Sequence, residues 1–238
     1  MNELALTYRD FISREATSLE SICRALVMHN RDKIQIKKED RAIQNMLRIV
    51  RAVISLSQKK GFQGMSLRDL SQETDLSMGA LYNYFNSKEE LFEMIYNEGK
   101  TMILQILEAH ATASDPRIRL QQAICAHLYL SESLPRIFSF FFMEAKNLSP
   151  KNQKNVITME QSSERYFEQI LLDGIKQQSF YIEDHTLMAG ALKALLQDWY
   201  LKRYKFSSRK VSVEQYAKFV IGFVEANLYS SQSDSQPG

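Results

Sequence analysis

The chain has 238 residues, a formal net charge of +2, and a composition that is 45% hydrophobic and 24% charged. These values are typical of a globular protein with a sizeable core, and 8 glycines and 4 prolines favour helices throughout. The sequence predicts neither a membrane span, since no uncharged apolar run reaches about 18 residues, nor a secretory signal, so we expect a cytoplasmic protein. Its 2 cysteines are too few for a disulfide framework or a paired-cysteine metal site, and we expect buried thiols.

Residues 1–40 form an amino-terminal extension. Between Leu19 and Val27 the apolar residues recur at helical spacing, which predicts a short amphipathic helix. The linker Asn30–Asp40 is polar and basic. Two interpretations of this linker remain open: a plain flexible connector, or an arm that touches phosphates or a minor groove through Lys33, Lys37 and Lys38.

A helix is predicted next, from Ile43 to about Lys60. Its apolar residues form one stripe as far as Ile54, and Gly61 suits a left-handed cap at its end. Lys and Arg strongly outnumber acidic residues between Arg31 and Lys60. Attraction to DNA phosphates needs such a cluster, although a solvated helix face gives the same pattern.

Met65–Leu91 contains several helix starts in close succession, each marked by a residue that can cap a helix. The caps are Ser66 with Asp69, Ser77, and Ser87 with Glu90. The first two helices, joined by the turn Thr74-Asp75-Leu76, have the spacing of a helix-turn-helix. The second of them, from Met78 to about Phe85, is then the helix that reads DNA.

The same segment resembles the amino-terminal domain of the TetR family of bacterial transcriptional regulators. The resemblance covers residues 41–95 and is carried by Gly61-Phe62, Ser66-Leu67, Leu70, Ser77, Gly79, Leu81-Tyr82, Tyr84-Phe85, Lys88-Glu89 and Leu91. Its one departure is the turn, where the family usually has alanine-glycine-valine. Asp75 stands in place of that glycine, and Asp is among the few other residues that adopt a positive φ.

The resemblance implies a DNA-contacting surface on these two helices. Phosphate contacts are expected from hydroxyl groups and one ammonium group, on Ser66, Ser77, Tyr82, Tyr84 and Lys88, and Tyr84 is favoured over Tyr82. Gly79 and Ala80 remove bulk where the helix meets the groove. Base-edge contacts are expected from Met78, Ala80 and Asn83, with a further guanine or phosphate contact from Arg68. Leu81 and Phe85 are expected in the core.

The rest of the chain predicts more helices, for a total of about nine to eleven in an all-α protein. A long helix is expected from Lys88 to about Ala111. By the family resemblance it links the DNA-binding domain to the rest of the chain and transmits movement between them. Asp115-Pro116 and Ser149-Pro150 resemble caps with proline at the first helical position, and Ser212 with Gln215 has capping-box spacing. Further helices are predicted at about 151–178, 184–203 and 213–229.

We therefore predict an extension at 1–40, a helix-turn-helix domain at 41–95, an effector-binding and dimerisation domain at 96–229 and a disordered tail at 230–238. The resemblance implies a homodimer in which the last two long helices pair, with candidate interface residues in Leu187–Leu201 and Phe219–Leu228. Two reading helices about 34 Å apart, or somewhat more, would read a pseudo-palindromic operator in double-stranded DNA.

The effector site is expected inside the helical core of each protomer. Ser133–Ala145 is unusually aromatic, and a helix that is apolar nearly all round is buried on several sides or lines a cavity. Core packing is the other interpretation of such aromatic residues. The candidate wall residues for a small apolar effector are Phe138, Phe141, Phe142, Met143, Tyr166, Trp199 and Tyr200.

Catalysis, a cofactor and a metal site are not expected. The 4 histidines are widely separated, and neither a metal-binding His pair nor a serine elbow is present. The sequence therefore favours a ligand-responsive repressor that binds its operator as a homodimer and is released by an apolar small molecule. The alternative is a helical interaction protein of the same fold that acts through a protein partner, with non-specific or no DNA binding.

Overall fold

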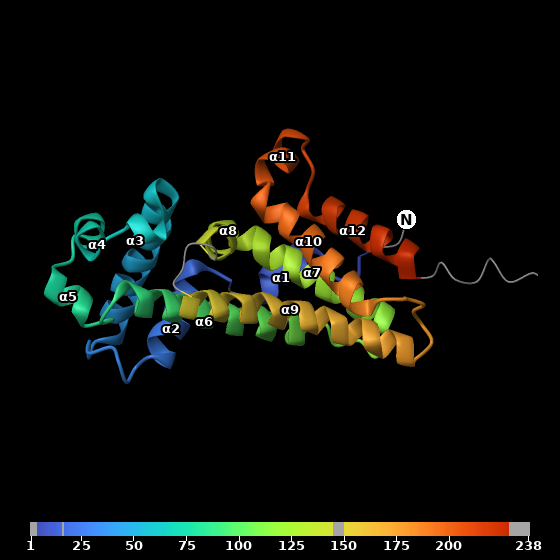
Figure 1. Ribbon diagram of the computed structural model, residues 1–238, viewed down its shortest axis with the longest axis horizontal. Coiled ribbons are helices and arrows are strands. Elements are labelled where there is room, and N and C mark those ends of the chain that lie inside the picture. Colours follow the sequence, from blue (N-terminus) through green and yellow to red (C-terminus); the bar gives the residue numbers. More distant parts are fainter. Residues whose placement is uncertain (1–3, 16, 145–149, 229–238) are drawn as a thin grey trace, which may run out of the picture. The chain divides into compact units, whose positions relative to one another are not determined.

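The computed structural model describes residues 4–15, 17–144 and 150–228, and in these ranges every regular element is a helix (Figure 1). The all-helical prediction is confirmed. The described helices are α1 (Tyr8–Arg14), α2 (Leu19–His29), α3 (Glu39–Gly64), α4 (Leu67–Thr74), α5 (Met78–Tyr82), α6 (Lys88–His110), α7 (Pro116–Ser133), α8 (Pro135–Glu144), α9 (Pro150–Lys176), α10 (His185–Leu201), α11 (Arg203–Ser208) and α12 (Val213–Leu228). The sequence pattern did not predict α1 and α11. The predicted Ser149 cap and the predicted disorder of residues 230–238 lie outside the described residues.

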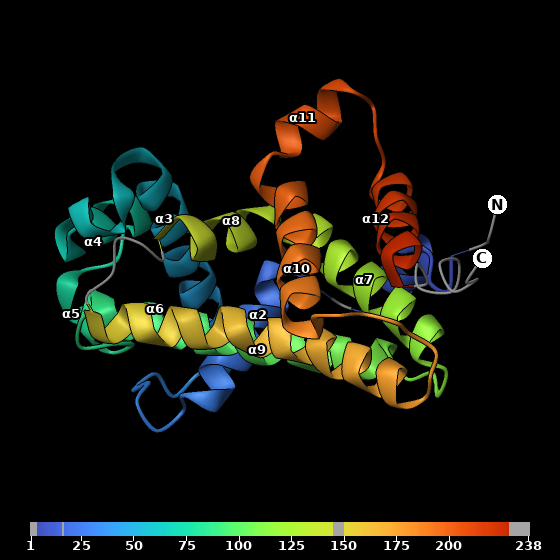
Figure 2. The same ribbon diagram turned by 45° about the vertical axis from the view of Figure 1, so that its right-hand side comes forward.

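Two compact units make up the structure, and neither is one continuous segment. Unit 1 comprises Met1–Glu15, Ile103–Ser133 and Glu160–Gly238, and unit 2 comprises Ala16–Met102 and Leu134–Met159. The chain passes between the units inside α6 and inside α9, two long helices that can be followed in Figure 2. The boundaries between the two compact units thus fall at other residues than the boundaries of the predicted functional domains, which stay a prediction. No described helix is both long and apolar enough to cross a membrane.

Unit 2 is built around α3. Helix α2 packs along α3 through an apolar side that buries Ile22 and Leu26, and α4 and α8 also pack on α3. The ring of Phe62 lies 5.1 Å from that of Phe92 and 6.4 Å from that of Phe140, between centroids. Phe140 belongs to α8, so this late helix completes the core of the unit that contains the helix-turn-helix. The carboxylate of Glu144, at the end of α8, accepts the N–H of Phe62 at 3.0 Å.

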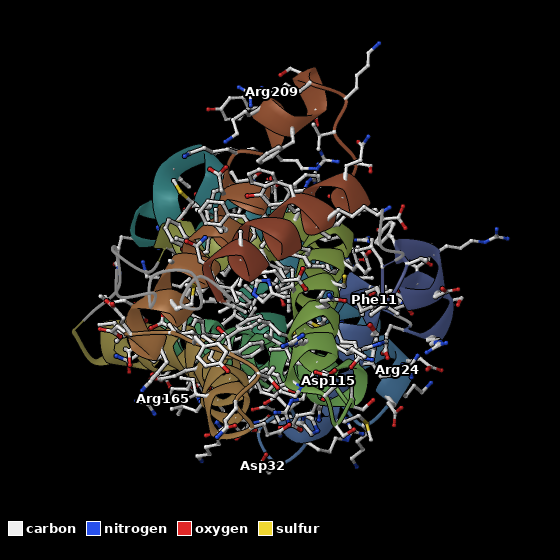
Figure 3. The ribbon with its side chains drawn as sticks, turned by 90° about the vertical axis from the view of Figure 1, so that its right-hand side faces the viewer. Phe11, Arg24, Asp32, Asp115, Arg165 and Arg209 are labelled. Carbon is white, nitrogen blue, oxygen red and sulfur yellow. The ribbon has the colours of Figure 1, made fainter. Side chains whose placement is uncertain are left out.

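Unit 1 is built around α7, on which α1, α10 and α12 pack. Phe11 holds α1 in place, because its ring lies on the side of α1 that faces α7, 5.9 Å from the ring of Tyr129 (Figure 3). Trp199 of α10 is fully buried, with its ring 4.9 Å from Phe206 and 5.1 Å from Tyr216. These aromatic contacts explain why the short helix α11 is fixed to unit 1.

Helix starts follow the predicted caps, with one shift. The N–H of Ser212 donates to the Gln215 side chain at 2.8 Å and the N–H of Gln215 donates to the Ser212 hydroxyl at 3.1 Å, which is a complete capping box. At α6, Ser87 accepts the N–H of Glu90 at 3.1 Å, but the Glu90 carboxylate accepts the N–H of Asn86 at 2.7 Å instead of that of Ser87. One of the two hydrogen bonds of the predicted capping box is therefore formed, and the other is made by the residue before Ser87.

Both cysteines are buried free thiols, as expected. Burial raises the pKa of Cys23 and of Cys125 to about 12. Each thiol therefore stays protonated at neutral pH and is a poor nucleophile or metal ligand.

Candidate nucleic-acid interface

Helix α4 starts at a reciprocal capping box. The Ser66 hydroxyl accepts the N–H of Asp69 at 3.2 Å, and the Asp69 carboxylate accepts the N–H of Ser66 at 2.7 Å. Lys60 lies 2.6 Å from the same carboxylate. The hydrogen bonds from Lys60 and then Ser66 hold the pKa of Asp69 well below its usual range. Arg68 is exposed beside this cap, so its guanidinium is available to a partner.

The turn between α4 and α5 adopts the conformation that the sequence predicted. Asp75 has φ 53° and ψ 34°, the left-handed region, and it ends α4. The Ser71 hydroxyl donates to the carbonyl of Leu76 at 2.6 Å, which fastens the exit of the turn to α4. Ser77 then caps α5 by accepting the N–H of Ala80 at 3.1 Å. Asp75 therefore does what glycine usually does at this position of the family.

Helix α5 has one buried side and one open side. Leu81 is 0% and Phe85 2% exposed, so both lie in the core as expected. Gly79 is exposed, and a Cβ there would have no other atom within 4 Å. Tyr82 is 48% exposed. The remaining base-contact candidates, all half-buried, are Met78, Ala80 and Asn83. A major groove admits one α-helix, and the open side of α5 has the small residues that close approach needs.

Tyr84 lies in the turn after α5, because the helix ends at Tyr82 and does not continue to Phe85 as predicted. It is 1% exposed, and burial raises the pKa of its phenol. A ring so enclosed cannot reach a phosphate without leaving the core, so the preference for Tyr84 over Tyr82 does not fit the structure. Tyr82 takes its place in the interface that we propose below.

Lys88 is engaged with the protein itself. Its Nζ donates to the carbonyls of Phe62 at 3.3 Å, Gln63 at 2.9 Å and Met65 at 3.1 Å. The ammonium also lies 5.4 Å from the centroid of the Phe62 ring. Lys88 thus satisfies carbonyls at the end of α3, a structural role that helical spacing alone does not reveal. Its phosphate contact stays a prediction.

Sequence reasoning missed a contact between the linker and the reading helix. The N–H of Gln35 donates to the carbonyl of Asn83, the C-cap residue of α5, at 2.9 Å. Lys33, close by in the chain, lies 3.7 Å from Glu90 at the start of α6. The basic composition of the linker was the only sequence signal for its position.

The aromatic residues of α8 lie in unit 2. Phe138 and Phe141 are 5% and 4% exposed, and the Phe141 ring packs edge-on against Tyr96 with 5.3 Å between centroids. A Cβ added at Gly99 would overlap the Phe141 ring, so α6 and α8 are in close contact there. Phe142 is half-buried and Met143 is 63% exposed. These candidates for the effector site are thus members of the unit that holds the helix-turn-helix.

The other three effector candidates belong to unit 1. Tyr166 is half-buried and donates its hydroxyl to the carbonyl of Leu107 at 3.0 Å. Trp199 is 0% exposed and donates its ring N–H to Glu132 at 3.0 Å, and Tyr200 is 7% exposed. The structure does not bring the seven residues together in one unit, and their role in binding an effector stays a prediction.

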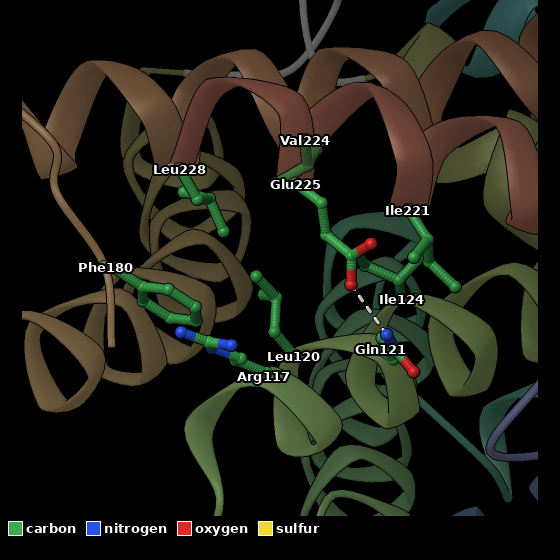
Figure 4. Close-up of a pocket in the computed structure, with 9 residues that line it drawn as sticks. All are labelled: Arg117, Leu120, Gln121, Ile124, Phe180, Ile221, Val224, Glu225 and Leu228. Atoms are coloured by element: carbon green, nitrogen blue, oxygen red, sulfur yellow. Dashed lines mark hydrogen bonds between the residues drawn. The ribbon is translucent and has the colours of Figure 1, made fainter. Parts of the chain in front are cut away.

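None of the seven effector candidates lines either of two hollows in the described part of the chain. In unit 1, α7, α12 and Phe180 enclose a narrow seam with no free room for water, where Gln121 donates to Glu225 at 2.6 Å (Figure 4). In unit 2, α2, the linker and α6 border a polar cavity of about 320 Å³. There His29 Nδ1 lies 2.7 Å from the Glu98 carboxylate. The polar lining of this cavity is unlike the apolar wall that the sequence predicted.

A capped turn between two short helices, the second with one side exposed, is typical of the helix-turn-helix class of DNA-binding proteins, and a second helical unit is present here. Residues 49–95 match the family model "Bacterial regulatory proteins, tetR family", and residues 113–222 match the model "Tetracyclin repressor-like, C-terminal domain". The chain belongs to the TetR family of bacterial transcriptional regulators, a family of DNA-binding proteins and not of enzymes.

Relatives of known sequence or structure support this assignment. The chain is 22% identical over 158 residues to the "Probable HTH-type transcriptional regulator YttP" of Bacillus subtilis (strain 168), covering 65% of this chain and 76% of the relative. It is 26% identical to the TetR family regulator PfmR of Thermus thermophilus, with TM-score 0.57 and coverage of 76% and 97%. The fold of AibR, crystallised in complex with isovaleryl coenzyme A and operator DNA, is also similar, with 19% identity, TM-score 0.63 and coverage of 74% and 95%.

Proposed function

We propose that this regulator is a ligand-responsive repressor that binds a pseudo-palindromic operator as a homodimer and leaves it when a small apolar molecule binds. The observation that carries the proposal is the open side of α5, where Gly79, Tyr82 and Asn83 reach the surface while Leu81 anchors the helix in the core. Asn83 can pair with adenine through two hydrogen bonds, and Tyr82 and Arg68 can donate to phosphates. This role would place the protein in the cytoplasm.

Exposed apolar side chains on α10 and α12 support the homodimer. Leu187 is 71%, Phe219 59% and Phe223 51% exposed, although each is a large apolar residue. The rings of Phe219 and Phe223 lie 6.3 Å apart on α12 and are nearly parallel. A pair of exposed neighbouring rings, such as Phe219 and Phe223, favours an interaction surface on α12. A second copy of the chain is the partner that the family resemblance implies, and a two-fold axis would present α5 twice.

The effector is proposed from the family and from the AibR complex, in which a similar fold carries isovaleryl coenzyme A and operator DNA together. An effector that binds one conformation better than the other shifts the balance between them. A coupling free energy of about 1 to 3 kcal/mol would change operator affinity about 5- to 150-fold, which suffices for a genetic switch. In the test below, decanoic acid is the mainly apolar probe, with a single carboxylate on an alkyl chain, and isovaleryl coenzyme A is the highly charged acyl probe.

Genomic footprinting followed by mobility-shift titration tests the function. We expect protection of short palindromes, tight binding to one of them, and release by decanoic acid. Asn83→Ala should weaken operator binding about 5- to 150-fold for each half-site, since each bidentate base contact contributes about 1 to 3 kcal/mol and the homodimer makes the contact twice. Asn97→Ala is the matched control, because Asn97 is an exposed asparagine of α6 away from the reading helix.

The alternative function, a helical interaction protein, predicts a different titration. Binding would then be blind to sequence, and it would disappear between about 50 and 200 mM salt as pure phosphate attraction does. Asn83→Ala and Asn97→Ala would bind equally. That result would exclude a sequence-specific repressor.

A further inference from the structure

The linker between α2 and α3 follows a fixed path across unit 2. The Asn30 side chain donates to the carbonyl of Leu26 at 2.9 Å and so closes the end of α2. Ile34 is 4% exposed and anchors the middle of the linker in the core. The Arg31 guanidinium then spans the loop, donating to the carbonyls of Ile36 at 2.7 Å and Lys37 at 2.9 Å. These contacts make the linker a built element and not a plain connector.

The path brings the linker to the end of the reading helix. Gln35 donates its N–H to the carbonyl of Asn83 at 2.9 Å, and Asn83 is itself the candidate for adenine recognition. In Figure 1 the linker runs as a blue loop near α5 and the start of α6, within the same unit. The linker therefore borders the surface on α5 that we propose for the major groove.

The charges that the linker presents there are positive. Lys37 and Lys38 are exposed, and neither has an ion pair with any residue in the described part of the chain. Glu39, the nearest carboxylate in the sequence after them, lies 3.7 Å from Arg24 and is partly balanced by it. Asp40 and Arg41, both exposed, offset each other in formal charge. Two exposed ammonium groups, on a linker that contacts the carboxyl end of α5 through Gln35, are complementary in charge to the phosphates that flank a groove.

We propose that Lys37 and Lys38 form a second DNA contact that grips the sugar-phosphate backbone next to each half-site. This inference rests on the proposed operator binding and adds to it, because the contact lies outside the helix-turn-helix. Phosphate contacts position a protein on DNA without reading bases. The linker thereby fixes the register of α5 through the Gln35–Asn83 hydrogen bond. An acidic protein segment is the rival occupant of the two lysines.

The test is the salt dependence of DNA binding. The variant Lys37→Gln/Lys38→Gln is titrated with operator and with unrelated duplex between about 50 and 300 mM salt, beside the control Lys176→Gln/Arg209→Gln. The control removes the same charge from exposed positions of unit 1. Each lost phosphate contact lowers the slope of log K against log salt by about 0.9. For the double variant we expect this slope to become less steep by about 1.8 per protomer, and we expect its affinity for operator and for unrelated duplex to fall equally. The control should keep the slope and the affinity of the wild type.

Hydroxyl-radical footprinting gives a second readout, in which the variant should lose protection of the sugars flanking each half-site and keep protection within it. An unchanged slope and footprint, in a variant that melts like the wild type while the wild type binds its operator specifically, would overturn the inference and leave the repressor function standing. Binding of an acidic peptide in place of DNA by the two lysines would overturn it as well. If the wild type itself shows no preference for any sequence, the proposed function fails instead.

Discussion

The ammonium of Lys88 donates to three carbonyls at the end of α3, close to the kink at Gly61 where φ is 73°. The carbonyls at a helix end have no partner within the helix, so an ammonium that satisfies several of them stabilises both segments. The family resemblance marks Lys88 as a DNA contact, whereas the hydrogen bonds give it a role in holding α3 to α6. One side chain can serve both, and the two roles respond differently to substitution.

Lys88→Met keeps the stem of the side chain and removes its donors. We expect the free energy of unfolding to fall by about 1 to 3 kcal/mol, since hydrogen bonds to a charged group are lost and partly buried carbonyls lose their partner. Chemical denaturation measures this, with Lys100→Met on α6 as the control. If stability is unchanged while operator binding alone is lost, the ammonium serves DNA and not the fold.

His127 gives unit 1 a dependence on pH. It is 1% exposed, and Lys193 Nζ lies 3.1 Å from its Nε2. Burial, and then the charge of Lys193, hold the pKa of His127 well below 6.5. The folded protein therefore keeps His127 neutral, whereas the unfolded chain takes up a proton as the pH falls through about 6.5. Because the unfolded state then binds more protons, stability falls as the pH is lowered.

Between pH 6.5 and 5.5 we expect this one group to cost the wild type about 1 kcal/mol of stability. His127→Gln removes the proton uptake, so the loss over the same interval should be smaller by that amount. Urea denaturation at a series of pH values measures both proteins. Parallel curves for the two would mean that His127 is protonated in the folded state too.

At the scale of elements, the turn between α4 and α5 depends on one left-handed residue. Asp75 adopts φ 53° without being glycine. Asp75→Gly should raise the free energy of unfolding by about 0.5 to 1 kcal/mol by relieving that conformation, and Asp75→Ala should lower it by a similar amount. Thermal melting measures the change, and the operator affinity of the glycine variant should stay as in the wild type. A destabilised glycine variant would show that the Asp75 carboxylate itself supports the turn.

Helix starts could be predicted from the sequence because caps are local. Ser66 with Asp69, Ser77, and Ser212 with Gln215 all cap helices where the spacing predicts them. The helices α1 and α11, of 7 and 6 residues, are too short to show a periodic pattern. Their position depends instead on distant partners such as Tyr129 for Phe11.

The candidate site was predicted less completely, since burial and long-range contacts decide it. The sequence places Tyr82 and Tyr84 on the same short segment, but only packing shows that Tyr84 is enclosed. Lys88 bonds to residues that lie 23 to 26 positions earlier, and Gln35 meets a carbonyl that belongs to Asn83. The aromatic character of α8 predicted the burial of Phe138 and Phe141 but not the 63% exposure of Met143, and it could not tell which unit buries the helix.

At the scale of the whole molecule, the homodimer depends on α10 and α12. Phe219→Ser/Phe223→Ser removes two exposed rings from the proposed interface. We expect a monomer by light scattering, and operator binding at least about 10-fold weaker because the two half-sites are no longer linked. Ile12→Ser, which removes a 50% exposed apolar residue from α1, is the control. A variant that remains dimeric would place the interface elsewhere.

Helix α8 follows the rest of the helix-turn-helix unit by many residues in the sequence, and this limits how the chain can be shortened without disturbing unit 2. Phe140 lies 6.4 Å from Phe62 and 5.6 Å from Phe92, and Glu144 holds the N–H of Phe62. A fragment ending at residue 95 would expose those two rings to water and strip an amide of its acceptor. A fragment meant to contain the folded helix-turn-helix should therefore include residues 134–144, because unit 2 is formed by two separate segments of the sequence.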